Sequence, residues 1–201
     1  MPKFRNFGLL VMALLMACAR GGDPAQRALS QATGRSVRPY CTRDFGRQHY
    51  SGACSVLVEP ERAEGLLAKV RAQLPSGYVA FIGTVHSLAD PPAQGTELVV
   101  APGTSQFDIL RVAASDAVNY DLSTEDLIRQ LQTWDQQVGI DIYQASTDSI
   151  GLRLKSVPDA LPEFAARVYR LCPDIVDQGL GNIEALQQQI QHQQRLDLWW
   201  D

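Results

Sequence analysis

The chain has 201 residues, four cysteines and a formal net charge of −4, and 45% of its residues are hydrophobic. This length allows a single domain to bury a substantial core. The small acidic excess, without any run of lysines or arginines, argues against nucleic acid as a partner.

The first 18 residues have the organisation of an export signal. Lys3 and Arg5 supply positive charge, and the apolar stretch from Phe7 to Met16 that follows is too short to span a bilayer. The stretch ends in Leu15-Met16-Ala17-Cys18, which resembles the lipobox of bacterial lipoproteins. The resemblance implies that residues 1–17 are a signal peptide and that Cys18 is acylated, with palmitate-type chains.

Lipidation predicts where the protein lies. Two or three acyl chains anchor a protein stably, whereas one chain alone holds it only marginally. Ala19-Arg20 lacks the Asp after the lipidated cysteine that commonly signals inner-membrane retention. We therefore expect an outer-membrane anchor with the domain facing the periplasm; the alternative is an ordinary secretory peptide with an incidental cysteine.

Removal of the signal leaves residues 18–201 and, because Lys3 and Arg5 leave with it, a net charge of −6. Residues 18–38 are rich in Gly, Ala, Gln and Ser with little apolar periodicity, which is typical of a flexible tether. We interpret residues 39–201 as one domain. In an oxidising compartment Cys41 and Cys54, which flank a turn-rich segment, are expected to form a disulfide.

The domain is predicted to alternate strands and helices. Expected strands are 55–58, 78–83, 97–101, 107–112, 139–143, 150–155 and 196–200, and expected helices are 60–74, 123–138, 159–172 and one that begins after Asn182. Segment 107–112 fits either pattern, and its Phe, Ile and Val favour a strand. Ser123, with Asp126 three residues later, predicts a helix N-cap, and Gly139 predicts its end. Cys172 closes the apolar face of its helix and is expected to be a buried small hydrophobe.

This order predicts an α+β fold. The sheet is expected to be mixed and largely antiparallel, with helices packed mainly on one side. From residue 107 onward the elements resemble a split β-α-β unit with one extra helix.

Several short segments together carry a family resemblance. They are Phe107-Asp108-Ile109-Leu110-Arg111, Asn119-Tyr120, the predicted helix that ends at Trp134, Cys172-Pro173-Asp174, Gln178-Gly179 and Leu198-Trp199-Trp200-Asp201. Over about residues 77–201 the chain resembles the bacterial domain-of-unknown-function family 4253. The resemblance implies a shared fold and brings no established activity, substrate or catalytic residue.

Two polar sets are candidate binding residues. The first is Asp174, Asp177 and Gln178, with Trp199 and Asp201 from the last strand; the second is Asp108, Asn119, Tyr120 and Asp148, at strand ends and turns. Turn capping and edge packing are the structural alternative for both sets. No phosphate loop, metal-ligand spacing or nucleophile elbow occurs, so no catalytic residue, metal or cofactor is predicted.

Two classes of function follow. The first is a lipid-anchored periplasmic protein that binds a protein partner, for example by neutralising a toxin. The alternative is a small envelope hydrolase or metal-assisted enzyme that uses the region of Asp174, Asp177 and Asp201.

Overall fold

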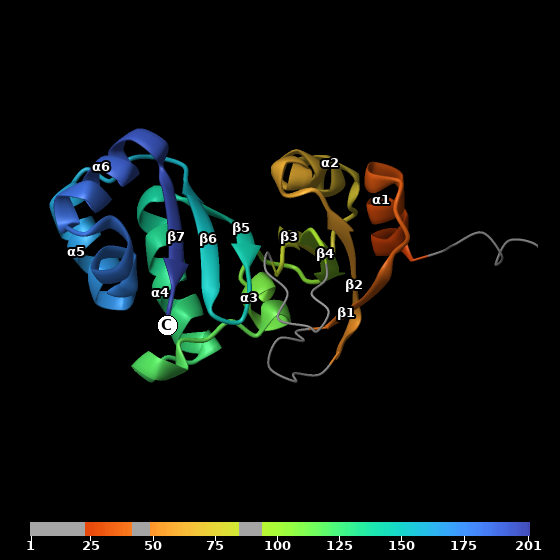
Figure 1. The fold of residues 1–201 in the computed structure, drawn as a ribbon, viewed down its shortest axis with the longest axis horizontal. Coiled ribbons are helices and arrows are strands. Elements are labelled where there is room, and N and C mark those ends of the chain that lie inside the picture. Colours follow the sequence, from red (N-terminus) through yellow and green to blue (C-terminus); the bar gives the residue numbers. More distant parts are fainter. Residues whose placement is uncertain (1–22, 42–48, 85–93) are drawn as a thin grey trace, which may run out of the picture.

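The computed structural model describes residues 23–41, 49–84 and 94–201. One seven-stranded mixed sheet runs through the molecule in the order β1-β2-β4-β3-β5-β6-β7, and its only parallel pair in the described ranges is β3 with β5 (Figure 1). The strands are β1 (Arg38–Cys41), β2 (His49–Val58), β3 (Tyr78–Ile82), β4 (Thr96–Pro102), β5 (Ile140–Ala145), β6 (Ser149–Leu154) and β7 (Arg195–Trp199). The α+β class and the largely antiparallel sheet are as predicted.

Helices lie on both faces of this sheet. They are α1 (Pro24–Thr33), α2 (Ala63–Gln73), α3 (Asp108–Ala113), α4 (Thr124–Val138), α5 (Leu161–Leu171) and α6 (Ile183–Gln193), with short 3-10 turns at Pro60–Arg62 and Val118–Tyr120 and a π-helix at Ile175–Leu180. None of the helices in the described ranges is long and apolar enough to cross a membrane.

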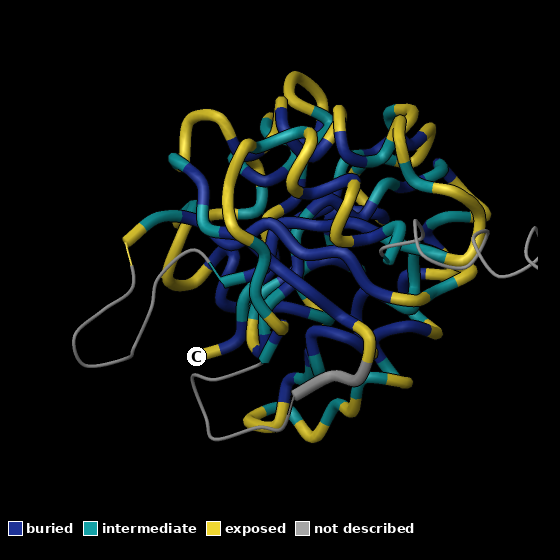
Figure 2. The backbone as a smooth tube through the Cα atoms, turned by 90° about the vertical axis from the view of Figure 1, so that its right-hand side faces the viewer, coloured by how far each residue is buried: buried dark blue, intermediate teal, exposed yellow. Residues whose placement is uncertain are grey.

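The central strand β4 supplies both halves of the core. Leu98 and Val100 pack in a cluster with residues of α1 and α2, whereas Val99 and Ala101 pack in the larger cluster with α3 to α6. Successive side chains of a strand point to opposite faces, so four helices cover one face and two cover the other. Figure 2 shows the buried strands in the middle of the molecule, with exposed turns around them.

Most predicted elements are confirmed, and α4 is confirmed in detail. The Ser123 hydroxyl accepts a hydrogen bond from Asp126 N, and the Asp126 carboxylate accepts one from Ser123 N, which completes a capping box. Gly139 ends the helix with φ +66°, where a Cβ would also meet the side chain of Lys155. In β7, Leu196 and Leu198 are buried and Asp197 is exposed, as the alternation predicted.

The prediction of a flexible tether over residues 18–38 is wrong for Pro24–Thr33, which form the helix α1. Asp23 caps this helix through its carboxylate, which accepts from Ala25 N, and Gly34 ends it in a left-handed conformation. Ala25, Ala28 and Leu29 are buried against the β2 side of the sheet. An Ala- and Gln-rich helix with only three buried residues has the composition of a spacer, which explains the error. The lipobox itself, residues 15–18, lies outside the described residues.

The strand predicted at 107–112 is a helix. The Asp108 carboxylate accepts hydrogen bonds from Thr104 N (2.9 Å) and Ser105 N (3.0 Å), which fixes the turn that leads into α3. Ile109, Leu110 and Val112 are then buried on the larger cluster. The apolar composition of this segment reflects burial and does not select a strand.

The expected Cys41–Cys54 disulfide is also corrected: within the described ranges the structure contains no disulfide. The antiparallel register of β1 with β2 places Pro39, and not Cys41, opposite Cys54. Cys54 is buried in the smaller cluster, where burial and the nearby Asp23 raise the pKa of its thiol to about 11. Cys172 is buried as predicted, and its thiol donates to the carbonyl oxygen of Trp199 (2.9 Å).

Candidate functional site

Three of the predicted residues come together around one cavity of about 300 Å³. Asn119, Asp148 and Asp201 line it, from the 3-10 turn after α3, the β5–β6 turn and the end of the chain. Sequence reasoning missed the other lining residues, which are Asp116, Ala117, Val118, Thr147 and Trp200. We call these eight residues the acidic cavity.

Backbone hydrogen bonds hold the three walls of the acidic cavity together. Asp116 N donates to Thr147 O (2.9 Å), and Trp200 N donates to Asp148 O (3.1 Å). The loop that carries Val118 is closed on itself by an antiparallel bridge between Ala117 and Leu122. The cavity is therefore a preformed feature of the fold.

Asp174, the strongest candidate from the sequence, lies behind this cavity. It is buried, and its carboxylate accepts hydrogen bonds from the Tyr120 hydroxyl (2.7 Å), Gln178 Nε2 (3.0 Å) and Asp201 N (3.0 Å). Burial acts to raise the pKa of Asp174, but these three donors outweigh it and hold the pKa below its usual value. The same contact raises the pKa of Tyr120 to about 12.

The three donors give Asp174 a positioning role. Tyr120 belongs to the turn that carries Asn119, and Asp201 belongs to the opposite wall, so one buried carboxylate ties two walls of the acidic cavity to the π-helix. Because its carboxylate already accepts three hydrogen bonds, Asp174 positions these walls and is not a binding group of the cavity.

The remaining predicted residues do not line the cavity. Asp177 accepts hydrogen bonds from the Tyr169 hydroxyl (3.1 and 3.3 Å) at the surface. Trp199 packs against Gly179, where a Cβ would lie 2.6 Å from its ring. Asp108 accepts from the backbone of the turn before α3 and pairs with Arg111 (2.8 Å). For these residues the structural alternative holds.

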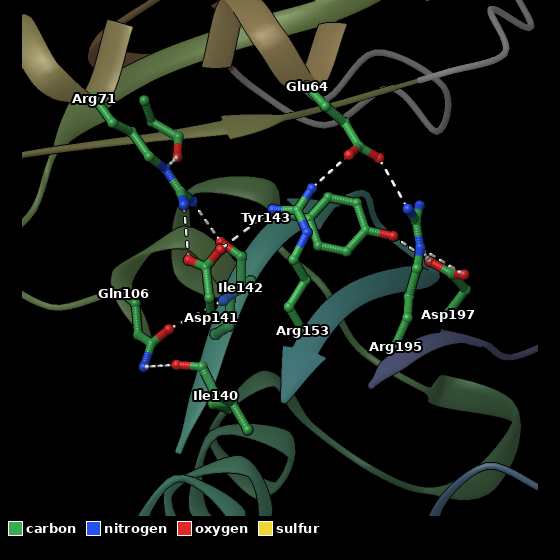
Figure 3. A network of polar contacts seen from close by, with 11 residues as sticks. Glu64, Arg71, Gln106, Ile140, Asp141, Ile142, Tyr143, Arg153, Arg195 and Asp197 are labelled. Carbon is green, nitrogen blue, oxygen red and sulfur yellow. Dashed lines mark hydrogen bonds and ion pairs between the residues drawn. The ribbon is translucent and has the colours of Figure 1, made fainter. Parts of the chain in front are cut away.

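A second polar arrangement, which sequence reasoning missed, lies on the face of β5–β7 opposite the larger cluster (Figure 3). The Tyr143 side chain crosses over Gly151 of β6, and its hydroxyl donates to Asp197 of β7. The guanidinium carbons of Arg153 and Arg195 lie 4.4 and 4.6 Å from the centroid of the Tyr143 ring. Burial and the bond to Asp197 raise the pKa of Tyr143 well above its usual value, so its hydroxyl keeps its proton.

Ion pairs link this tyrosine to α2. Glu64 pairs with Arg195 (2.9 Å) and with Arg153. Burial acts to raise the pKa of Glu64, but the hydrogen bond from Arg195 and the charges of both arginines hold it below its usual value. Asp141 pairs with Arg71 of α2 (2.7 Å) and with Arg153 (3.5 Å). We call these residues, with Asp197, the ion-pair network.

The ion-pair network is balanced in charge, with three arginines and three carboxylates (Figure 3). Each guanidinium already has at least one carboxylate partner, so the network offers no excess charge to a ligand. Its geometry is that of a junction between α2 and strands β5 to β7.

Next to the network, the sheet is split between β3 and β5. These strands pair only at Ile82 and Gln144. Elsewhere along the split, side chains form hydrogen bonds with backbone groups of the two strands. Arg71 donates to Ala80 O (2.9 Å) and Ile142 O (2.6 Å). Gln106 accepts from Ile142 N (3.0 Å) and donates to Ile140 O (3.3 Å). A cavity of about 440 Å³ opens beside these two side chains.

With this geometry established, comparison with known proteins gives the family. Residues 97–201 match the family described as Domain of unknown function (DUF4253). The chain belongs to this family. No curated protein and no solved structure matches the chain.

The DUF4253 region extends from β4 to β7 and contains the whole acidic cavity. It begins at Glu97, later than the start near residue 77 that the sequence suggested. The ion-pair network joins Asp141, Arg153 and Arg195 inside the region to Glu64 and Arg71 before it. The network therefore attaches the preceding helices to the DUF4253 region.

Proposed function

We propose that this chain is a lipid-anchored periplasmic module that binds a protein partner through the surface around the acidic cavity. One observation carries the proposal. Among the residues that the structure describes, Val118 is the only large hydrophobic residue that is mostly exposed (67%), and it lines a preformed cavity. A single exposed valine is ordinary on a protein surface. Its place on a firmly bonded turn beside acidic groups distinguishes this one.

Energetics support a contact at this point. Covering a valine that is two-thirds exposed contributes about 1–2 kcal/mol, and a preformed turn loses little conformational entropy on binding. The acidic rim adds a charge pattern that selects basic partners. Toxin neutralisation is one form that such binding takes.

The enzyme alternative has less support. The described residues contain no group of three or more His, Cys, Asp or Glu side chains that could hold a metal ion. Asp174 accepts three hydrogen bonds, and Asp177 is bonded to Tyr169. Two of the three carboxylates of that alternative, Asp174 and Asp177, therefore have structural partners.

Placement of the cavity fits an anchored binding module. α1 lies at one end of the long axis of the molecule, and residue 201, which lines the cavity, lies toward the other end (Figure 1). A lipid on Cys18 would hold the α1 end near the membrane and direct the cavity toward the periplasm.

Photocrosslinking tests the binding proposal. We expect p-benzoylphenylalanine at position 118 to give a discrete ultraviolet-dependent adduct in intact cells. The same residue at Lys69, exposed on α2, is the matched control and should not give that adduct. Val118→Asp should then abolish direct binding of the purified partner. Absence of any adduct specific to position 118 would contradict the proposal.

Lipidation has its own test. Globomycin blocks the peptidase that cleaves before a lipidated cysteine, so the uncleaved precursor should accumulate in treated cells. Normal processing under the drug, or an unchanged product from a Cys18→Ser chain, would contradict the anchor. Membrane fractionation then separates an outer-membrane from an inner-membrane location.

A further inference from the structure

We infer that the acidic cavity takes up the guanidinium group of an arginine side chain from the partner protein. This inference rests on the proposed function, and it assigns a chemistry to the site. Four features carry it: the sign of the charge, an unused hydroxyl, the spread of the acceptors and the neighbouring valine.

The charge in the acidic cavity is of one sign. Asp116, Asp148 and Asp201 are among the eight lining residues, and no Lys, Arg or His is. Asp148 accepts a hydrogen bond from the Ser146 hydroxyl (2.8 Å), which uses only part of its capacity. A carboxylate has about four acceptor positions, so the cavity suits a cation with several donors.

Thr147 supplies an independent sign of a ligand. The residue is only 9% exposed and lines the cavity, yet its side-chain hydroxyl has no hydrogen bond within the part of the chain that the structure describes. Its backbone carbonyl accepts from Asp116 N, so the residue is held firmly in place. The hydroxyl oxygen itself is accessible, since it is not among the buried side-chain atoms that lack a partner. It is therefore open to a donor from a ligand.

The arrangement of these acceptors favours guanidinium over a metal ion or an ammonium group. The cavity carboxylates are not among any described group that could converge on a metal. A guanidinium carries five donors in a planar fork and reaches acceptors on several sides, whereas an ammonium is a compact point charge.

A protein is the source that the neighbourhood favours. Val118 lines the cavity and exposes most of its surface, so an arginine that enters would bring a neighbouring apolar residue over it. A free guanidinium compound such as agmatine shares the chemistry but leaves this valine uncovered.

The test is a ¹H–¹⁵N NMR titration of the full chain with N-acetyl-arginine-N-methylamide. We expect shifts at the backbone amides of Asn119, Thr147 and Trp200, with millimolar affinity. The citrulline analogue, which has the same shape without the charge, should bind at least tenfold more weakly. Equal binding of the citrulline analogue, or shifts that avoid the cavity, would overturn the inference.

Variants sharpen the result. Thr147→Val and Asp148→Asn should each weaken arginine binding at least threefold, whereas Asp159→Asn, an exposed aspartate outside the cavity lining, should leave it unchanged. Native-like spectra of each variant establish that folding is retained. Equal weakening by Asp159→Asn would show a general charge effect and would overturn the assignment.

Two further outcomes separate this inference from the proposed function. A partner crosslinked at Val118 combined with no arginine binding would overturn the guanidinium site and leave the proposed function standing. Agmatine that binds tenfold more tightly than the arginine amide, with no crosslinked partner, would overturn the protein source and the proposed function together. Arginine peptides that compete with the crosslinked partner would support both.

Discussion

Gly151 offers the sharpest test of the ion-pair network. Its backbone does not require glycine, since its φ lies outside the left-handed range, but a Cβ there would lie 2.6 Å from Tyr143 Cζ and 2.7 Å from the Tyr143 hydroxyl oxygen. Gly151→Ala must therefore displace the ring. The displacement breaks the bond to Asp197 and moves the ring away from Arg153 and Arg195.

The cost follows from the contacts that change. Overpacking of this kind costs about 1–3 kcal/mol, and each weakened cation–π contact costs about 0.5–1 kcal/mol. We expect Gly151→Ala to lower the free energy of unfolding by about 2–4 kcal/mol, measured by urea denaturation of the purified chain. The matched control is Gly65→Ala in α2, where nothing lies within 4 Å of the added Cβ. That change should stabilise the chain by about 0.5–1 kcal/mol.

A double-mutant cycle assigns the cost to the tyrosine. Tyr143→Leu removes Cζ and the hydroxyl and leaves the contact of the new Cβ with Gln144 Cβ at 2.9 Å, so Gly151→Ala in that background should cost about 1 kcal/mol less than in the native chain. The reasoning fails if Gly151→Ala costs less than about 0.5 kcal/mol in the native chain. It also fails if the cost is the same in both backgrounds.

Three further predictions concern charge and thiol chemistry. Asp174→Asn should lower the free energy of unfolding by about 2 kcal/mol at pH 7. Because the folded-state pKa of Asp174 is lowered, the ionised carboxylate stabilises the fold above the unfolded pKa near 4, and this stabilisation is lost as the pH falls further. The difference in free energy of unfolding between the variant and the native chain should therefore narrow in urea titrations at pH 3. Glu64→Gln should cost only about 0.5–1 kcal/mol, since the pairs it loses are partly exposed, and the difference should shrink in 1 M salt. Cys54 and Cys172, buried thiols whose pKa is raised to about 11, should resist iodoacetamide in the folded chain and react in urea without a reductant. A disulfide-linked peptide that contains either residue in the mass spectrum would contradict this.

Elements with strong local signals could be predicted from the sequence. α4 combines a capping box, an apolar face and a terminal glycine, all within 17 residues from Ser123 to Gly139. α1 and α3 lack such agreement. α1 has Asp23 and Gly34 at its ends but few apolar residues between them, and α3 has the β-favouring composition of a buried segment, so tertiary packing decides both.

The candidate site residues show the same difference between local signals and contacts made in the folded chain. Asn119, Asp148 and Asp201 could be named because turns and strand ends often carry binding groups, and the structure places all three around one cavity. The role of Asp174 could not be predicted, because its contact with Tyr120 joins residues 54 positions apart. The ion-pair network was missed for the same reason: Glu64 and Arg195 are separated by 131 positions.

The helix α1 changes what a lipid anchor would mean for this chain. A tether reaching to residue 38 would let the domain wander far from the membrane, but α1 begins at Pro24 and packs on the sheet. Only residues 19–23 then separate Cys18 from the folded domain, and five residues extend at most about 18 Å. An anchor on Cys18 would therefore restrict the orientations of the domain and keep α1 toward the membrane. It would leave the acidic cavity, toward the other end of the molecule, open to the periplasmic partner that we propose (Figure 1).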